Sequence, residues 1–324
     1  MTDAKEIWVF VELTSKGIRR VSLQLLAKAR DLEINSRVAA LVPGGNEDVL
    51  KELSKHGAEK IYVIEGLDEY KIDTYTEVVA ECVKKYNPHI VLFGATHIGR
   101  ELAPSVASSL HMGLTADCTD LSMQGDNLIQ TRPAFGGNII ADISCKTFPQ
   151  MATVRPNVFS AKEFDGEPEI IREKVNAPQS IFEVIEEIKA QGEHKSIEDA
   201  RIVISGGRGL KRKEDFEMLE MLASSLGGAV GCSRPMVEKG WMPKSAQVGQ
   251  SGKTISPDLY IAIGVSGSVQ HQAGVKSAKK IVAINSDSSA PIFDIADYAL
   301  VGDLYEIVPA MIEELRRGKK NDRA

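Results

Sequence analysis

Short apolar runs alternate with amphipathic segments through the first hundred residues of the chain. The runs are a few residues long and rich in valine, isoleucine and leucine, as is typical of buried strands in a parallel sheet. They lie at Ile7 to Leu13, Arg37 to Val42, Lys60 to Ile64 and His89 to Phe93. The segments between them predict helices near residues 18–31, 46–56 and 73–86, with Asn46 and Asp73 as N-caps. Strands that alternate with helices predict a parallel sheet covered by helices on both faces.

The pattern changes after the fourth predicted strand. The turn from Gly94 to Arg100 opens a helix that runs to Leu110. This turn could bind an anion at the N-terminus of the helix, with Arg100 as the counter-charge. The alternative interpretation is a tight strand-to-helix turn in which Arg100 forms a salt bridge. Residues 117–149 predict short strands with turns at 125–127 and 136–138. Alternation from Leu128 to Arg132 predicts a half-exposed antiparallel edge, and Gln150 to Val154 predicts another strand.

Charge rises between residues 160 and 200, where Pro168 and Pro178 interrupt the pattern. Residues 191–195 have the composition of a linker, so we predict two α/β domains, 1–195 and 196–324. In the second domain, apolar runs predict strands at 200–205, 229–232, 259–263, 281–284 and 298–301. Asp303 is the predicted N-cap of a helical stretch, and Pro309 is the predicted start of the last helix. The first domain is predicted to be nucleotide-binding-like with a parallel sheet, and the second to be doubly wound.

Composition and charge narrow the class of protein. The 324 residues are 43% hydrophobic and 26% charged, which is enough to build two globular cores of ordinary size. A net charge of −6 provides no basic footprint, so no nucleic-acid partner is expected. Four cysteines form no metal-binding spacing and are expected to be reduced. We expect a soluble, cytoplasmic protein, because the sequence shows neither a signal peptide nor a membrane span.

Glycine-rich polar segments follow several of the predicted strands in the second domain. They are Ser205 to Gly209, Cys232 to Arg234, Gln247 to Gly252 and Gly264 to Gly267. Glycine lets a ligand approach the backbone closely, and ligands of open α/β sheets bind at the carboxyl ends of the strands. The sequence contains no paired nucleophile and base in a known order, no HExxH motif and no P-loop. This combination indicates a site that binds and tunes a cofactor rather than one that performs side-chain catalysis.

The stretch from Leu259 to Asn285 carries a resemblance at many positions of fixed spacing. These are Leu259-Tyr260-Ile261-Ala262, Gly264-Val265-Ser266-Gly267, Val269-Gln270-His271, Gly274, Ile281 and Ala283-Ile284-Asn285. Further matching segments are Ser205 to Gly209, Gly231 to Arg234, Gln247 to Lys253 and Ala290 to Phe293. Together they resemble the alpha subunits of electron-transfer flavoproteins, closely in the C-terminal third and more loosely in the N-terminal part.

The resemblance implies FAD as the cofactor and assigns site residues to it. Residues along the dinucleotide would be Arg208 and Ser233, and those at its adenosine end Asn285, Asp303 and Leu304. Arg234 would lie against the isoalloxazine ring, and the loop of Gln247, Val248, Gly249, Gln250 and Ser251 would face the ring. The flavin-binding turn would consist of Ser266, Gly267, Ser268, Val269, Gln270 and His271, with His271 near the C2 carbonyl. Ser251 stands where many relatives have threonine, and its hydroxyl would donate to flavin N5. Taken alone, Arg234 would be a surface ion pair and His271 a structural histidine.

The resemblance also implies partners. Members of this family form a heterodimer with a beta subunit. They carry electrons to or from an acyl-CoA dehydrogenase or another flavin or iron–sulfur protein. The resemblance therefore implies that the chain is an electron carrier rather than a conventional enzyme. Residues 113–119 and 131–138 resemble the anaerobic and nitrogen-fixation branch of the family, which includes NADH-oxidising, electron-bifurcating complexes. The sequence does not decide between a bifurcating complex and a simple carrier.

Two alternative functions remain. One is a stand-alone NAD-dependent oxidoreductase, disfavoured by the missing GxGxxG motif, and the other is a nucleotide-sensing module.

Overall fold

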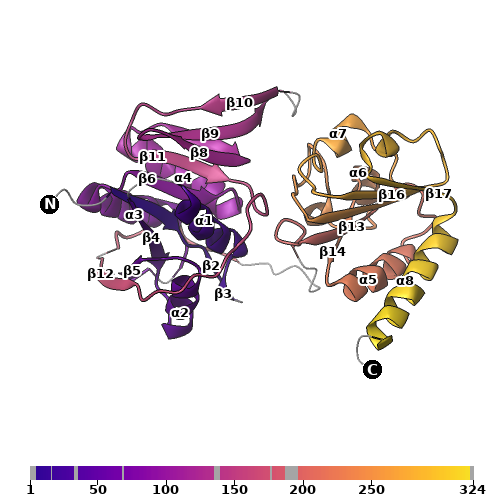
Figure 1. The fold of residues 1–324 in the computed structure, drawn as a ribbon, viewed down its shortest axis with the longest axis horizontal. Helices are drawn as coiled ribbons and strands as arrows, with labels where there is room; N and C mark the ends of the chain where they lie inside the picture. Colours follow the sequence, from indigo (N-terminus) through magenta and orange to yellow (C-terminus); the bar gives the residue numbers. More distant parts are fainter. Residues whose placement is uncertain are drawn as a thin grey trace. The chain divides into compact units, whose positions relative to one another are not determined.

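The computed structural model describes residues 5–15, 17–32, 36–67, 69–134, 139–175, 177–186 and 196–321 (Figure 1). The chain divides into two compact units, residues 1–189 and 190–324, each with its own hydrophobic core. The predicted linker at 191–195 and the predicted turn at 136–138 lie outside the described residues.

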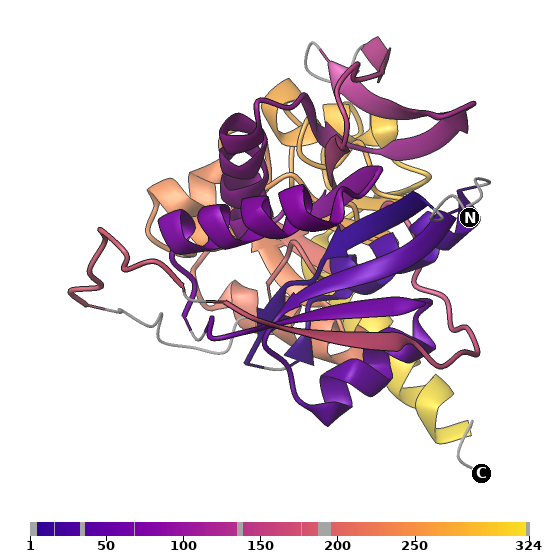
Figure 2. The same ribbon diagram turned by 90° about the vertical axis from the view of Figure 1, so that its left-hand side faces the viewer.

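The first unit is built on a seven-stranded parallel sheet of order β12-β5-β4-β1-β6-β11-β7. Its strands are β1 (Lys5–Phe10), β4 (Ser36–Pro43), β5 (Lys60–Glu65), β6 (Ile90–Gly94), β7 (Leu114–Cys118), β11 (Gln150–Val154) and β12 (Glu169–Lys174). Its helices are α1 (Arg20–Asp31), α2 (Glu47–Lys55), α3 (Ile72–Tyr86) and α4 (His97–Leu110). Ile7 and Val9 of β1 pack toward α1 and α2, whereas Trp8 and Phe10 pack toward α3 and α4, which lie side by side (Figure 2). The predicted parallel sheet with helices on both faces is confirmed.

Two small sheets complete this unit. One is antiparallel, of order β10-β9-β8, and the other pairs β2 with β3. Their strands are β2 (Leu13–Thr14), β3 (Gly17–Ile18), β8 (Asp120–Gln124), β9 (Asn127–Ala134) and β10 (Ile139–Ile143). Residues 128–132, predicted as an edge, instead belong to β9, the central strand of its sheet. Alternation of apolar and polar residues indicates that one face of the strand is exposed to solvent. It does not indicate whether the strand pairs with one neighbour or with two.

The second unit is a five-stranded parallel sheet of order β14-β13-β15-β16-β17. Its strands are β13 (Ile202–Gly206), β14 (Ala229–Cys232), β15 (Leu259–Ile263), β16 (Ile281–Asn285) and β17 (Tyr298–Val301). Its helices are α5 (Asp215–Leu226), α6 (Arg234–Glu238), α7 (Val269–Gln272) and α8 (Leu304–Asn321), with 3₁₀ turns η2 (Lys244–Ala246) and η3 (Pro291–Ile295). Helices α5 and α8 pack on one face, and loops with the short α7 cover the other. The expected α/β class is therefore confirmed for both units.

Three local predictions need comment. The N-cap of α2 is Asn46, as predicted, because its side chain accepts a hydrogen bond from Val49 N at 3.0 Å. Asp73 is not the N-cap of α3, which begins at Ile72 with Lys71 as its N-cap. Pro309 does not start the last helix but lies inside α8, five residues after Leu304. The start is set by Asp303, whose carboxylate accepts the backbone N–H of Tyr305 at 2.8 Å.

The turn after β6 holds a carboxylate from the chain itself. Thr96 is the N-cap of α4 and its Oγ1 lies 2.7 Å from Oε1 of the buried Glu12. An alanine Cβ at Gly99 would lie 1.8 Å from the carbonyl oxygen of Gly94, so the turn is closed tightly. Arg100 pairs with Asp117 at 3.2 Å. Of the two readings of this turn, the structure supports the tight turn with an arginine salt bridge.

Candidate functional site

The carboxyl ends of β13, β14 and β15 meet at one edge of the second sheet. From β13 the chain continues to β14 on one side, and it then returns to place β15 on the other side of β13. Such a reversal of strand order opens a crevice just beyond the carboxyl ends, where open α/β sheets bind their ligands. Three of the segments predicted as binding loops follow these same strands, whereas the fourth, Gln247 to Gly252, follows the 3₁₀ turn η2 instead of a strand.

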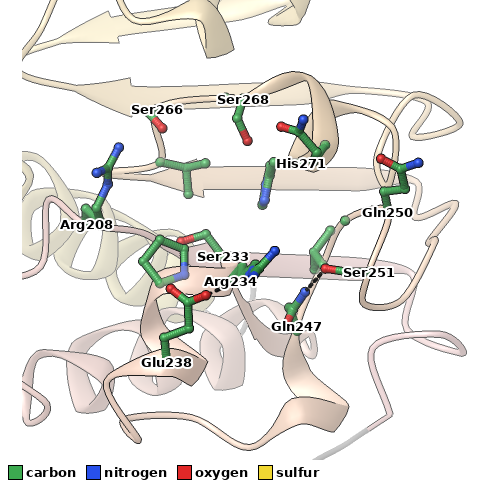
Figure 3. A pocket seen from close by; sticks show the side chains of 16 residues that line it. Arg208, Ser233, Arg234, Glu238, Gln247, Gln250, Ser251, Ser266, Ser268 and His271 are labelled. Atoms are coloured by element: carbon green, nitrogen blue, oxygen red, sulfur yellow. Dashed lines mark hydrogen bonds and ion pairs between the residues drawn. The ribbon is translucent and has the colours of Figure 1, made fainter. Parts of the chain in front are cut away.

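A cavity of about 560 Å³ lies at this edge, within the range of about 300–1,000 Å³ typical of ligand pockets. Its lining residues are Arg208, Ser233, Arg234, Pro235, Glu238, Gln247, Val248, Gly249, Gln250, Ser251, Val265, Ser266, Gly267, Ser268, Gln270 and His271. Figure 3 shows Ser266, Ser268 and His271 on one side, facing Ser233, Arg234 and Gln247 across the opening. Four segments far apart in the sequence thus converge on one cavity.

Most of the residues predicted for the cofactor line this cavity, and four do not. Val269 is 77% exposed on α7. Asn285 donates from its amide to Val265 O at 3.0 Å and so braces the turn after β15. Asp303 caps α8, and Leu304 is buried in the core beside α5. The predicted contacts of these last three residues with the adenosine end stay predictions. Pro235, Glu238 and Val265 also line the cavity; Val265 lies within the predicted turn 264–267, whereas Pro235 and Glu238 were not predicted.

Two glycines let the loops around the cavity pack closely against neighbouring backbone. Gly267 has φ +79°, and an alanine Cβ there would lie 2.3 Å from the backbone nitrogen of Ile292. At Gly252 a Cβ would lie 2.3 Å from the carbonyl oxygen of Gln247. Real Cβ atoms essentially never come within 3.0 Å of such atoms, so both positions require glycine.

Arg234 is the first residue of α6, directly after its N-cap Ser233. Its Nε lies 2.8 Å from Oε1 of Glu238, one helical turn later, and the arginine and glutamate side chains are 67% and 58% exposed. The guanidinium and the carboxylate both line the cavity (Figure 3). A ligand in the cavity would therefore meet a fixed cation whose field is partly offset by Glu238.

His271 contributes no charge to the cavity wall near neutral pH. Its Nε2 lies 2.7 Å from the hydroxyl of Tyr260, and only 5% of the residue is exposed. Burial lowers the pKa of His271 to about 4, although the Val248 backbone acts in the opposite direction. Nδ1 is buried and has no hydrogen-bond partner among the described residues. A buried nitrogen is costly to leave unpaired, so a polar ligand atom that reached Nδ1 would be stabilised there in addition to the nearby Val248 backbone.

The low pKa of His271 predicts a loss of stability in acid. Because the unfolded histidine has a pKa near about 6.5, the unfolded chain binds more protons between about pH 6.5 and pH 4. Stability should therefore be complete above about pH 6.5 and should fall toward pH 4, by up to about 3 kcal/mol from this group. Urea unfolding at several pH values should show a shallower pH dependence for His271→Gln. The exposed His97 serves as control, and an equal change in His97→Gln would contradict the assignment.

These features fit a flavin dinucleotide. The cavity offers a cation, several hydroxyl and amide donors, a glycine-lined wall and an unpaired buried nitrogen. Among the described residues, no group of three or more His, Cys, Asp or Glu side chains is placed to hold a metal ion. No helix in the described ranges is both long and apolar enough to cross a membrane.

Comparison with known proteins agrees with this fit. The family profile of the electron transfer flavoprotein domain matches residues 7–179, and that of the electron transfer flavoprotein FAD-binding domain matches residues 196–276. Protein FixB of Clostridium saccharobutylicum is 42% identical over 326 residues, which cover 98% of each chain. This chain belongs to the electron-transfer flavoprotein alpha subunit family. Its second unit is an FAD-binding domain, and FAD is the cofactor.

Two more relatives of the family show its range. Electron transfer flavoprotein subunit alpha of Clostridium acetobutylicum is 42% identical over 328 residues, or 97% of this chain and 98% of that protein. Lactate dehydrogenase (NAD(+),ferredoxin) subunit LctC of Acetobacterium woodii is 40% identical over 329 residues, or 97% of this chain and 78% of that protein. FixB and clostridial proteins are thus among the relatives, in agreement with the branch that the N-terminal motifs resemble.

Proposed function

We propose that this chain is the FAD-binding subunit of a cytoplasmic electron carrier that pairs with a beta subunit. FAD supplies the one-electron chemistry when it is bound. The chain's own residues hold the cofactor between the glycine-rich turns and place the Arg234 cation and the hydroxyl and amide donors around it. The single observation that carries the proposal is this cavity, which has a cation and donors but no described nucleophile–base pair.

The redox partners follow from chemistry and from the relatives. Acyl-CoA dehydrogenases, or other flavin or iron–sulfur proteins, are the partners we propose for electron exchange. LctC belongs to a lactate dehydrogenase whose name contains both NAD(+) and ferredoxin, which supports a place for this chain in a bifurcating complex. The first unit exposes Ile139, Ile140 and Phe148 by 52%, 66% and 42%, which supports a protein partner on that unit.

Coexpression with a beta subunit from the same genome should yield a stable heterodimer that contains FAD. The chain alone should be poorly soluble or poor in flavin, because its apolar side chains stay exposed. Size-exclusion chromatography with light scattering gives the stoichiometry, and the flavin released from the complex is counted by absorbance. Two FAD per heterodimer would indicate bifurcation, and one FAD with AMP a simple carrier. A monodisperse monomer that is fully flavinated and active without a partner would refute the proposed pairing.

The alternatives have less support. A stand-alone NAD-dependent oxidoreductase would retain nicotinamide cofactor and show no flavin spectrum. A nucleotide-sensing module would use the equivalent crevice of the first unit, between β1 and β6. There the Glu12 carboxylate already lies against Thr96 at the N-terminus of α4, where a phosphate would bind. This arrangement argues against a nucleotide in the first unit.

A further inference from the structure

Lys244 connects two residues of the loop that borders the cavity. Its Nζ donates to Oε1 of Gln247 at 2.9 Å and to the backbone carbonyl oxygen of Ser251 at 2.7 Å. An ammonium group can only donate hydrogen bonds, so the atom of Gln247 that faces it has to be the amide oxygen. The orientation of the Gln247 amide is thereby fixed by Lys244.

That orientation determines what the amide presents to Ser251. Nε2 of Gln247 donates to Oγ of Ser251 at 2.9 Å (Figure 3), and Gln247 is 2% exposed, so water offers its amide little alternative. The serine oxygen accepts this bond, and its one hydrogen must point elsewhere. Among the described residues, none accepts that hydrogen. Ser251 lines the cavity and is exposed, so the hydrogen is open to water when the cavity is empty and to a ligand atom when the cavity is filled.

We propose that Lys244 is a positioning residue for the cofactor: through Gln247 it turns the hydroxyl hydrogen of Ser251 toward the flavin ring. This inference rests on the proposed function, which supplies the flavin. Without Lys244, the Gln247 amide can rotate and offer its oxygen to Ser251, which would draw the hydroxyl hydrogen away from the ring. Lys244 does not line the cavity and lies outside the segments that carry the family resemblance. Neither the cavity lining nor the resemblance therefore identifies it as a site residue.

The test uses the FAD-loaded heterodimer and the variant Lys244→Met. FAD labelled with ¹⁵N at N5 reports the hydrogen bond to that atom, and quenching of flavin fluorescence gives the Kd of FAD. We expect the N5 resonance to move to the value seen in Ser251→Ala, and the Kd to rise about two- to tenfold. Lys244→Arg keeps a donor and should stay close to the unmodified protein.

The matched control is Lys253→Met. Lys253 belongs to the same loop, but its Nζ pairs with Glu198 at 2.9 Å and its side chain is outside the cavity lining. The variant removes the same charge, so an effect that acts only through the electric field would appear in both variants. Equal shifts of the N5 resonance in the two would overturn the proposal.

A double-mutant cycle separates action through Ser251 from direct effects. In the Ser251→Ala background, Lys244→Met should change neither the N5 resonance nor the Kd further. An undiminished effect in that background would overturn the proposal, and so would an unchanged N5 resonance in Lys244→Met or in Ser251→Ala. In each of these cases FAD is still bound and the proposed function stands. A purified heterodimer without any FAD would instead refute the proposed function itself.

Discussion

Replacing Gly267 with alanine should remove FAD from the protein almost completely. The added Cβ would lie 2.3 Å from the backbone nitrogen and 2.4 Å from the Cα of Ile292, so the turn after β15 or η3 must move. The positive φ of +79° adds a strain of about 1–2 kcal/mol, and the overlap adds about 1–3 kcal/mol. Because the turn is also a cavity wall, we expect at least a hundredfold rise in the Kd of FAD. Flavin content after purification and urea unfolding measure the two effects.

Gly227 provides the matched control for that substitution. It ends α5 with φ +72°, close to that of Gly267, but a Cβ there would meet no atom within 4 Å. Gly227→Ala therefore reproduces the backbone strain without the overlap, and it should cost about 1 kcal/mol of stability and retain FAD. If both variants lost FAD equally, the close approach of Gly267 to Ile292 would not be the reason that glycine is required.

Arg234→Ala should lower the first one-electron potential of the bound flavin. Reduction adds negative charge to the ring, and a guanidinium stays protonated at any working pH. At about 4 Å and an effective dielectric of about 20, a charge pair is worth about 4 kcal/mol. The 67% exposure of Arg234 and the neighbouring Glu238 reduce this value. We expect a tenfold change in the equilibrium, which is about 59 mV for one electron, in a spectroelectrochemical titration. Arg234→Lys should retain part of the effect.

The control for Arg234 is an exposed helical arginine that pairs with glutamates of its own helix and that lies outside the cavity lining. Arg317 of α8 pairs with Glu313 one turn away at 2.6 Å, where the two side chains are 66% and 65% exposed, and with Glu314 at 3.6 Å. Arg317→Ala should leave the potential unchanged, whereas Glu238→Gln should raise it, because the carboxylate no longer offsets the cation. An unchanged potential in Arg234→Ala with FAD still bound would reduce Arg234 to an ordinary surface ion pair, worth about 0–1 kcal/mol.

Buried parallel strands were the most predictable part of the fold. Runs such as Ile90 to Phe93 are apolar on both faces, and only a covered parallel strand requires that pattern. Strand β12 was missed because it pairs only with β5 at the edge, where charged side chains such as Glu169 are tolerated. The start of α8 was misplaced because a proline usually marks the first turn, whereas here the capping by Asp303 sets the start.

Most of the cavity lining was also predicted from the sequence, because three of its segments are turns directly after parallel strands and the family resemblance supplied the loop at 247–251 and residues 268–271. The sequence could not provide contacts that depend on where side chains meet in space. Glu238 lies within reach of Arg234 because both belong to the short helix α6, four residues apart, and this helix was not predicted. The hydrogen bond between the side chains of Tyr260 and His271 joins a strand to a short helix. The spacing of two residues in the sequence does not predict such a pair. The same holds for the bonds of Lys244.

The two faces of the second sheet are built differently, and this has a consequence for how such a protein can diversify. One face is completed by α5 and α8, which pack a continuous apolar core, whereas loops complete the other face; the cavity lies at the carboxyl ends of the strands and is lined largely by loop residues. Substitutions in these loops should change the surroundings of the cofactor and leave the packing of the core around α5 and α8 largely unchanged. Exchange of a few loop side chains should therefore change the redox poise of the bound cofactor while the helical framework stays the same.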